Sequence, residues 1–206
     1  MRLNNYSYLI LPERTGSLEA DVKNLLECNG KGATYAHVAA VAEANVDIAL
    51  RFGLEVSSCT NAALLHDISA VIAPKDMMDY AKQNGLELCE AELRFPFLLH
   101  QRISRIVAED YFGITDKTVL SAIECHTTLR PYASKQDMAL FIADKIAWDQ
   151  PGVPPFDAAV RAALERSLED ACLEYMTYMA DNDKILYPHT LWSLALNWLR
   201  SGRQQA

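Results

Sequence analysis

A histidine and an aspartate stand side by side in the run AALLHDISAVI, residues 62–72, which is otherwise almost entirely apolar. Apolar runs of this kind are buried in folded proteins, so both hydrated side chains enter the interior with it. An ionised carboxylate that is buried without a partner costs several kcal/mol. The chain must therefore fold so that compensating groups reach His66 and Asp67, and this requirement constrains it more than any other sequence feature.

The sequence on both sides of this pair is typical of α-helices. Over residues 35–52, apolar and aromatic side chains share one face at i, i+4 and i+7 spacing. Gly53 follows this segment as a helix C-terminal glycine does, and Ser134 with Asp137 predicts a capping box at the start of another helix. The run YSYLIL, residues 6–11, is a strand candidate without a clear partner. We therefore expect an all-α protein of about nine or ten helices.

The C-terminal third contains the clearest candidate for a break in the chain. The Pro- and Gly-rich stretch QPGVPPF, residues 150–156, predicts a division between a main bundle and a C-terminal helical pair. The pair would consist of one long amphipathic helix over residues 156–180 and a final helix after Pro188. His189, at the start of that final helix, is assigned no metal.

Composition excludes several classes of protein. The formal net charge is -8 and no basic block occurs, which argues against a nucleic-acid surface. No apolar stretch approaches the length that spans a bilayer, and the N-terminus lacks the pattern of a secretion signal, so no membrane partner is expected. The five cysteines form no CxxC pair, which argues against a thiolate zinc site and indicates a reducing, cytoplasmic location.

Further polar residues occur in apolar surroundings on separate predicted helices. His37 lies on the apolar face of its helix, His100 follows FPFLL, His126 ends VLSAIECH, and Asp144 lies in ALFIADKIAW. Each of them alone is explained by a hydrogen-bonded core position. Together with the His-Asp pair, they indicate a central site for one or two divalent ions, because a cation offsets the buried carboxylates and accepts neutral imidazoles. The mixed nitrogen and oxygen set favours iron, manganese or zinc over calcium or magnesium.

This ordered series resembles the H…HD…D signature of the HD-domain metal-dependent phosphohydrolases, an all-α family with a metal at the centre of a helical bundle. The local phrases LLHDI, FLLH, AIECHTT, LFIAD and YPHT are similar to those of bacterial HD proteins that hydrolyse diadenosine tetraphosphate symmetrically to two ADP. The resemblance covers residues 34–206 as the HD-domain bundle and leaves residues 1–33 as an N-terminal extension that packs on it. It implies the metal ligands His37, His66, Asp67 and Asp144, with iron as the usual ion.

The resemblance also implies which residues lie on the phosphate side of the metal. His100 and His126 would either contact the nucleotide or hold a second ion. Thr127 and Arg130 fall in a loop that the family places near the phosphates. Lys145 is a further candidate phosphate contact. Arg130 and Lys145 also fit simpler roles as surface residues, and for both of them the two alternatives stay open.

These expectations lead to a function with named alternatives. Asp67 is the catalytic candidate, because it is placed to bind the metal and to orient the attacking water. We expect hydrolysis of a phosphoanhydride bond in a nucleotide, with diadenosine tetraphosphate as the first candidate substrate. The sequence KIAWDQ after Asp144 departs from these relatives, so a nucleoside monophosphate, a guanosine tetraphosphate alarmone, or a regulatory nucleotide-binding role without turnover are the alternatives. A homodimer is expected on base rate alone.

Overall fold

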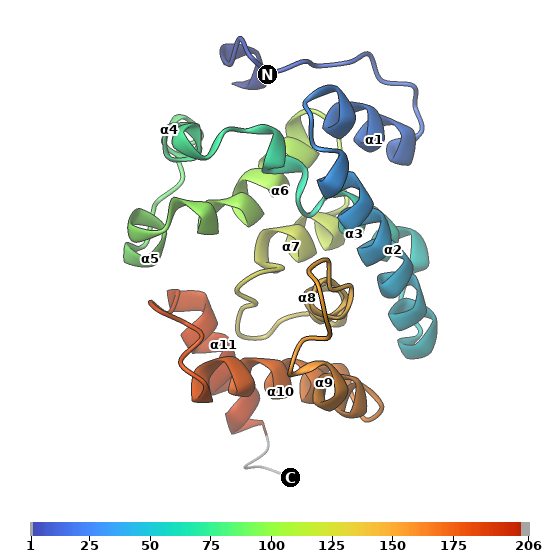
Figure 1. The fold of residues 1–206 in the computed structure, drawn as a ribbon, viewed down its shortest axis with the longest axis vertical. Coiled ribbons are helices and arrows are strands. Elements are labelled where there is room, and N and C mark those ends of the chain that lie inside the picture. Colours follow the sequence, from blue (N-terminus) through green and yellow to red (C-terminus); the bar gives the residue numbers. More distant parts are fainter. Residues whose placement is uncertain (1, 203–206) are drawn as a thin grey trace.

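Helices account for all the regular secondary structure of residues 2–202, which are the residues that the computed structural model describes. Figure 1 shows their arrangement. The α-helices in this part of the chain are α1 (Leu18–Cys28), α2 (Gly32–Phe52), α3 (Val56–Leu65), α4 (Met77–Gln83), α5 (Glu90–Arg94), α6 (His100–Asp110), α7 (Lys117–Cys125), α8 (Lys135–Ile146), α9 (Asp157–Leu164), α10 (Leu168–Asp181) and α11 (Thr190–Ser201). Four short 3-10 helices are η1 (Arg2–Asn5), η2 (Ile68–Val71), η3 (Pro74–Asp76) and η4 (Pro96–Leu99).

The all-α prediction is confirmed, and the predicted helix ends at Gly53 and Ser134 are confirmed with it. Gly53 adopts the left-handed conformation with φ of 65° and closes α2. The Ser134 hydroxyl accepts the N–H of Asp137 at 3.1 Å, and the Asp137 carboxylate accepts the N–H of Ser134 at 3.0 Å. This reciprocal pair is the capping box that the sequence predicts for α8.

The strand predicted over residues 6–11 is wrong, because this segment is a turn followed by irregular chain. A strand needs a partner for its backbone ladder, and no other strand occurs within residues 2–202. Side chains hold the segment instead. The Tyr8 hydroxyl donates to Asp76 at 2.8 Å and accepts the N–H of Ala73 at 3.1 Å, and further along the Tyr111 hydroxyl donates to the Pro12 carbonyl at 2.7 Å.

The long helix predicted over residues 156–180 is also wrong, because the chain breaks between Leu164 and Leu168 into α9 and α10. At the break, the Ser167 hydroxyl accepts the N–H of Asp170 at 3.0 Å and caps α10. Apolar residues keep a helical spacing across the break, and periodicity alone therefore does not detect it. This division brings the number of α-helices in the described residues to eleven.

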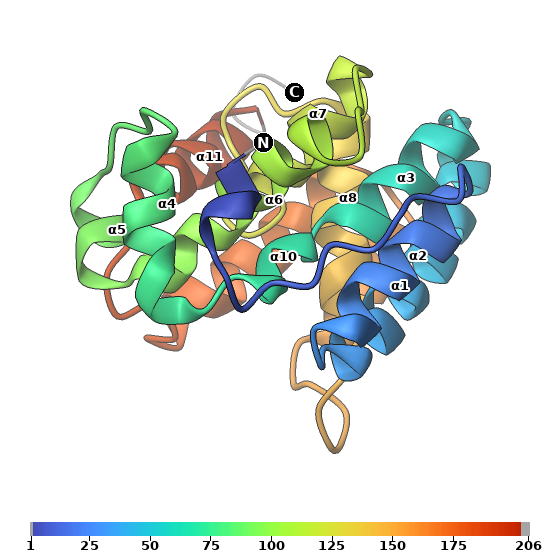
Figure 2. The ribbon, with the colours of Figure 1, turned by 90° about the horizontal axis from the view of Figure 1, so that it is seen from above.

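One continuous apolar core joins the N-terminal segment to the last helix. Leu3, Val22, Phe141 and Ala195 are all fully buried, and they belong to the same cluster of packed side chains. Viewed from above, α1 to α3 lie on one side, α4 and α5 on the other, and α6, α7 and α8 between them (Figure 2). The predicted boundaries at residue 34 and near residues 150–156 stay predictions. None of the helices in residues 2–202 combines the length and apolarity needed to cross a bilayer.

Candidate metal centre

Three histidines lie at helix ends that converge in the middle of the bundle. His66 follows the last residue of α3, His126 follows the last residue of α7, and His100 is the first residue of α6. The sequence places His66 and Asp67 within one helical turn, but α3 ends at Leu65, and Asp67 connects it to η2 with φ of -108° and ψ of 19°. The helix therefore stops at the functional pair.

The four predicted metal ligands lie together in the structure. The Nε2 atom of His37, from α2, is 3.1 Å from Oδ1 of Asp144, from α8. The Nε2 atom of His66 is 3.6 Å from the same Asp144 oxygen and 3.7 Å from Oδ2 of Asp67. Distances of this size leave room for one ion between two nitrogens and two carboxylates.

His100 and His126 extend this group on the other side of Asp67. Their Nε2 atoms lie 3.6 and 3.5 Å from Oδ1 of Asp67, and they are 2.9 Å from each other. Asp67 therefore reaches both halves of the cluster, one with each carboxylate oxygen. We refer to His37, His66, Asp67, His100, His126 and Asp144 as the metal cluster.

Backbone carbonyls fix the proton positions on three of these imidazole rings. For His66, His100 and His126, the Nδ1 atom lies 2.7, 2.7 and 2.9 Å from the carbonyl oxygen three residues earlier. A carbonyl only accepts, so Nδ1 carries the proton in each ring. A neutral imidazole has one N–H, and its Nε2 atom therefore presents a lone pair to the centre of the cluster.

This arrangement fits a metal ion. Two lone pairs at 2.9 Å, on His100 and His126, repel each other unless a proton or a cation lies between them. His66 Nε2 is buried and has no hydrogen-bond partner among the described residues. Neutral imidazoles with lone pairs, placed beside two carboxylates, form a donor set for a divalent transition metal.

The pKa values describe how the cluster is charged without a metal. Burial disfavours a charged His66, but the adjacent Asp67 and Asp144 outweigh burial and raise its pKa to about 9. Burial lowers the pKa of His126 to about 4, which keeps its lone pair available at neutral pH. Burial alone would raise the pKa of Asp67 and Asp144, but the surrounding histidines and Lys145 hold both well below the ordinary value. The two acids are therefore ionised.

Lys145 forms an ion pair with Asp144, a residue of the metal cluster. Its ammonium contacts Oδ2 of Asp144 at 2.5 Å and lies over the rings of Phe141 and Tyr175 at 5.3 and 5.8 Å. Only 15% of its side chain is exposed, so it is not a solvated surface lysine. Its positive charge lies beside Oδ2 of Asp144, the carboxylate oxygen that does not face His37 and His66.

The loop after His126 reaches the cluster through Thr127 but not through Arg130. The Thr127 hydroxyl is 2.9 Å from Nε2 of His100. Arg130 instead contacts Ser121 and donates to Asp137 at 3.0 Å, in a groove formed by α6 and α7 residues outside the metal cluster. The structure thus brings Thr127 to the predicted site and uses Arg130 to join α7 to α8.

Gln101 is a residue of the site that the sequence does not single out. Its amide oxygen accepts the N–H groups of Thr127 and Thr128 at 3.1 and 3.2 Å, and its amide nitrogen donates to the Thr128 hydroxyl at 3.1 Å. Gln101 is fully buried and fixes the start of this loop against α6. The one sequence feature that points to Gln101 is its position directly after His100.

A second group with metal-binding side chains has different chemistry. Cys89, Glu92 and His189 lie close together, but Arg102 donates to both oxygens of Glu92 at 3.0 Å. His189 Nδ1 accepts the N–H of Leu191 at 3.1 Å, which leaves the proton of the neutral ring on Nε2, 3.7 Å from Glu92. The backbone N–H of Cys89 and the guanidinium of Arg102 already donate to this carboxylate, so the group is a structural contact.

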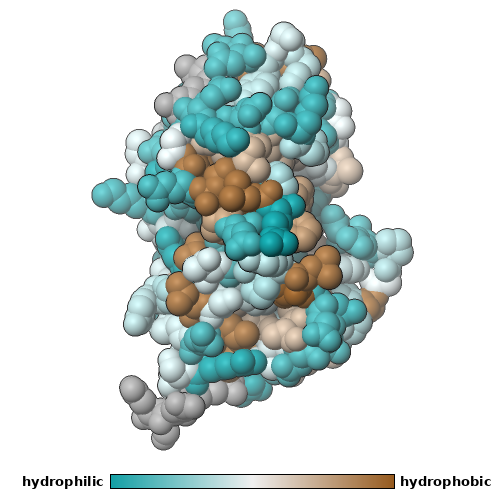
Figure 3. All heavy atoms as spheres, turned by 90° about the vertical axis from the view of Figure 1, so that its left-hand side faces the viewer, coloured by the Kyte–Doolittle hydropathy of each residue, from teal (hydrophilic) through white to brown (hydrophobic). Residues whose placement is uncertain are grey.

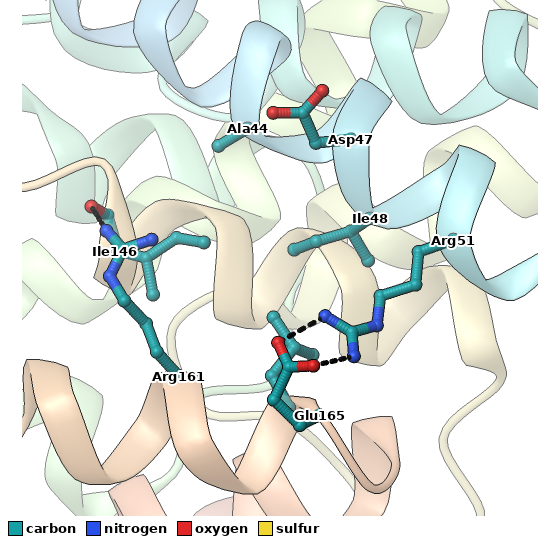
Figure 4. Close-up of a pocket in the computed structure, with 8 residues that line it drawn as sticks. Ala44, Asp47, Ile48, Arg51, Ile146, Arg161 and Glu165 are labelled. Atoms are coloured by element: carbon teal, nitrogen blue, oxygen red, sulfur yellow. Dashed lines mark hydrogen bonds and ion pairs between the residues drawn. The ribbon is translucent and has the colours of Figure 1, made fainter.

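The cavity shown in Figure 4 also lies apart from the metal cluster. Arg51 makes two hydrogen bonds to Glu165, at 2.5 and 2.6 Å. Arg161 donates to Asp157 at 2.9 Å and to the Ile146 carbonyl at 3.2 Å. Its arginines are therefore paired, and Arg161 ties α9 to the C-terminal end of α8, the helix that carries Asp144.

Comparison with known proteins agrees with this geometry. The HD domain family model matches residues 34–149, a range that includes every member of the metal cluster. The chain belongs to the HD domain family. The chain is 39% identical to an "uncharacterized protein in pepC 5'region" of Lactococcus lactis subsp. cremoris, over 63% of this chain and 67% of that protein. It is 27% identical to a symmetrical bis(5'-nucleosyl)-tetraphosphatase of Bacillus subtilis, over 82% of this chain and 90% of that protein.

A solved structure shows the same HD-domain fold. It is the crystal structure of a predicted HD superfamily hydrolase involved in NAD metabolism from Clostridium acetobutylicum. The match has a TM-score of 0.81 at 28% sequence identity, and it covers 89% of this chain and 97% of the other. This coverage extends beyond the matched family model, so the fold of almost the whole chain is shared with a member of the superfamily.

Proposed function

We propose that this HD domain hydrolyses a phosphoanhydride bond of a nucleotide, with diadenosine tetraphosphate as the first candidate substrate and two ADP as the products. The observation that carries the proposal is the set of imidazole Nε2 atoms directed at one another and at the carboxylates of Asp67 and Asp144. The symmetrical tetraphosphatases among the relatives support the choice of substrate.

His37, His66, Asp67 and Asp144 would hold a divalent transition metal, with iron as the first candidate and manganese or zinc as alternatives. A bound divalent metal supplies positive charge that activates water and neutralises phosphate oxygens. His100 would contact the phosphates or help to hold a second ion, and His126 would do the same. Both fit either role, because each presents an unprotonated Nε2 at neutral charge.

Asp67 is the proposed catalytic residue. It is the most exposed member of the metal cluster, with 29% of its side chain accessible, against 14% for Asp144 and 12% for His37. A substrate entering from solvent therefore meets Asp67 first. Its carboxylate is ionised and would orient the attacking water and accept its proton. The Thr127 hydroxyl, next to His100, would lie beside a phosphate oxygen.

Phe97 supports a nucleotide rather than an inorganic polyphosphate as the substrate. Its ring stacks on His100 with centroids 4.6 Å apart and planes inclined by 23°, and 65% of the residue is exposed. Leu93, in α5, and Phe95, directly after it, are exposed as well. The side of the molecule on which α5 lies has apolar patches between hydrophilic residues (Figure 3). A nucleobase would stack on the exposed face of Phe97 while its phosphates reach the cluster.

A nucleoside monophosphate is the second candidate substrate, because the similar solved structure is described as a hydrolase involved in NAD metabolism. A panel of nucleotides, with products separated by anion exchange, tests the proposal. The wild type should convert diadenosine tetraphosphate to ADP alone, and Asp67→Asn should abolish turnover.

Three results would contradict the proposed substrate. Formation of AMP and ATP would exclude symmetrical cleavage, and turnover of monophosphates alone would favour the second candidate. Tight nucleotide binding without any turnover would indicate a regulatory module.

A further inference from the structure

His37 is held differently from the other histidines of the metal cluster. The rings of His66, His100 and His126 each have Nδ1 fixed by a backbone carbonyl at 2.7 to 2.9 Å. His37 Nδ1 is buried and has no hydrogen-bond partner among the described residues. The one ring without a backbone anchor is thus a proposed metal ligand, whose orientation must still be fixed for Nε2 to reach the ion.

Asp149 is the acceptor that faces this nitrogen. Its Oδ2 atom lies 3.8 Å from His37 Nδ1, and its carboxylate is part of the chain that continues from α8. The other ring nitrogen of His37 faces Asp144 at 3.1 Å, and Asp144 comes from α8 itself. The α8 helix and the irregular chain that follows it therefore each supply a carboxylate to one side of the same imidazole.

We infer that Asp149 is the positioning residue for His37, accepting the Nδ1–H and so directing the Nε2 lone pair to the metal. Only 12% of the His37 side chain is exposed, whereas 57% of the Asp149 side chain is exposed. Rotation of this exposed side chain closes 3.8 Å to a hydrogen bond without moving the packed ring. The contact gives His37 the carboxylate partner that metal-binding histidines use when no carbonyl is available.

The inference rests on the metal site of the proposed function, and its test measures metal affinity without substrate. Metal-stripped protein is titrated with Mn²⁺ in competition with a chromophoric chelator, for the wild type, Asp149→Ala and Asp149→Asn. Asp47→Ala is the matched control, because it removes the same charge from an exposed position of α2, the helix that carries His37. Melting temperatures of the stripped proteins are measured alongside.

The affinity of Asp149→Ala should fall by about 10- to 100-fold, the usual effect of removing such a partner. Asp149→Asn should stay close to the wild type, because its amide oxygen accepts the same N–H. The Asp47→Ala affinity and all melting temperatures should be unchanged.

Three results would overturn the inference. The first is equal affinity in Asp149→Ala and the wild type. The second is an equal loss in Asp149→Asn, which would leave only an effect of charge. The third is a lower melting temperature of stripped Asp149→Ala, which would assign the residue a structural role. If the wild type binds no Mn²⁺, the metal site of the proposed function fails instead.

Discussion

Two carboxylates in this protein meet histidines in opposite ways. Glu92 faces N–H groups, because Arg102 donates a hydrogen bond to it and the Nε2–H of His189 lies 3.7 Å from it. Asp67 is met by imidazole rings whose backbone contacts leave lone pairs directed at it. Both sites contain acids and histidines within reach of one another, and the difference lies in which nitrogen carries the proton. The first site is complete as a structural contact, whereas the second needs a cation.

The largest expected effect breaks the Asp67 side of this comparison. Asp67→Ala removes the carboxylate that reaches both halves of the metal cluster, so both the metal and the proposed proton acceptor are affected. Turnover of the best nucleotide substrate should fall by about 10² to 10⁴-fold or more. Steady-state kinetics and metal content check this result. Full rate with full metal content in the variant would refute the role of Asp67.

Glu92→Ala removes the carboxylate of the structural contact, and we expect it to lower the free energy of unfolding. Arg102 is half-buried beside Glu92, and removing one partner of such a pair costs about 3–5 kcal/mol in the free energy of unfolding. Denaturant unfolding measures this cost. Metal affinity of the folded variant should be unchanged, because neither Glu92, Arg102 nor His189 belongs to the metal cluster. A loss of metal without a loss of stability would reverse the assignment of the two sites.

The same contact predicts a pH dependence of stability. Burial opposes ionisation of Glu92, but the nearby His189 Nε2–H and the hydrogen bonds from the Cys89 N–H and Arg102 outweigh it and lower its pKa from 4.5 to about 2. A depressed acid pKa stabilises the fold above the unfolded value, and this contribution is lost as the pH falls from 4.5 toward 2. Wild type and Glu92→Gln should therefore differ in unfolding free energy at pH 6 and converge near pH 2. A constant difference would contradict the assigned pKa.

The metal cluster predicts a pH dependence of metal affinity, which should rise with pH above neutrality. Without metal, His66 holds a proton up to about pH 9, and an ion must displace that proton. Affinity for Mn²⁺ should rise about tenfold per pH unit between pH 7 and 9 and then level off, with about one proton released per ion. Calorimetry in buffers of different ionisation enthalpy counts the protons. Binding without proton release would mean that His66 is not a ligand.

Phe97→Ala should have the smallest effect of the set. Loss of one base-stacking surface costs about 1 kcal/mol, or about fivefold in KM for a nucleotide. The hydrogen bond that fixes Nδ1 of His100 goes to the backbone carbonyl of Phe97, so the substitution keeps it, and kcat should change little. Phe97→Tyr should restore KM, while Phe95→Ala, a nearby exposed aromatic, serves as the control. An unchanged KM for nucleotides in Phe97→Ala would remove the stacking role.

The sequence predicts the inner part of the metal cluster because burial makes polar residues conspicuous there. His37, His66 and Asp144 interrupt apolar helical patterns, and no ordinary core requires them. Asp149 is an exposed residue directly before the Pro- and Gly-rich stretch of residues 150–156, where an acid is unremarkable until its distance to His37 is known. The roles of such residues depend on contacts between segments far apart in the chain, which periodicity does not encode.

Helix ends were harder to predict than helices. The apolar spacing runs through the end of α3 at Leu65 and through the break before Leu168, so both appear continuous in the sequence. At the first point, the end of the helix lets His66 and Asp67 face the cluster. Three histidines of the metal cluster thus lie at helix ends, whereas the apolar faces of the helices form the core.

The most direct test of the account is elemental analysis of the protein purified without chelator, for the wild type and for Asp144→Asn. We predict at least one iron, manganese or zinc ion per wild-type chain and a large loss of that metal in the variant, with both proteins folded. A folded wild type without a transition metal, or an Asp144→Asn protein with the full metal content, would contradict the claim that the cluster is a metal centre.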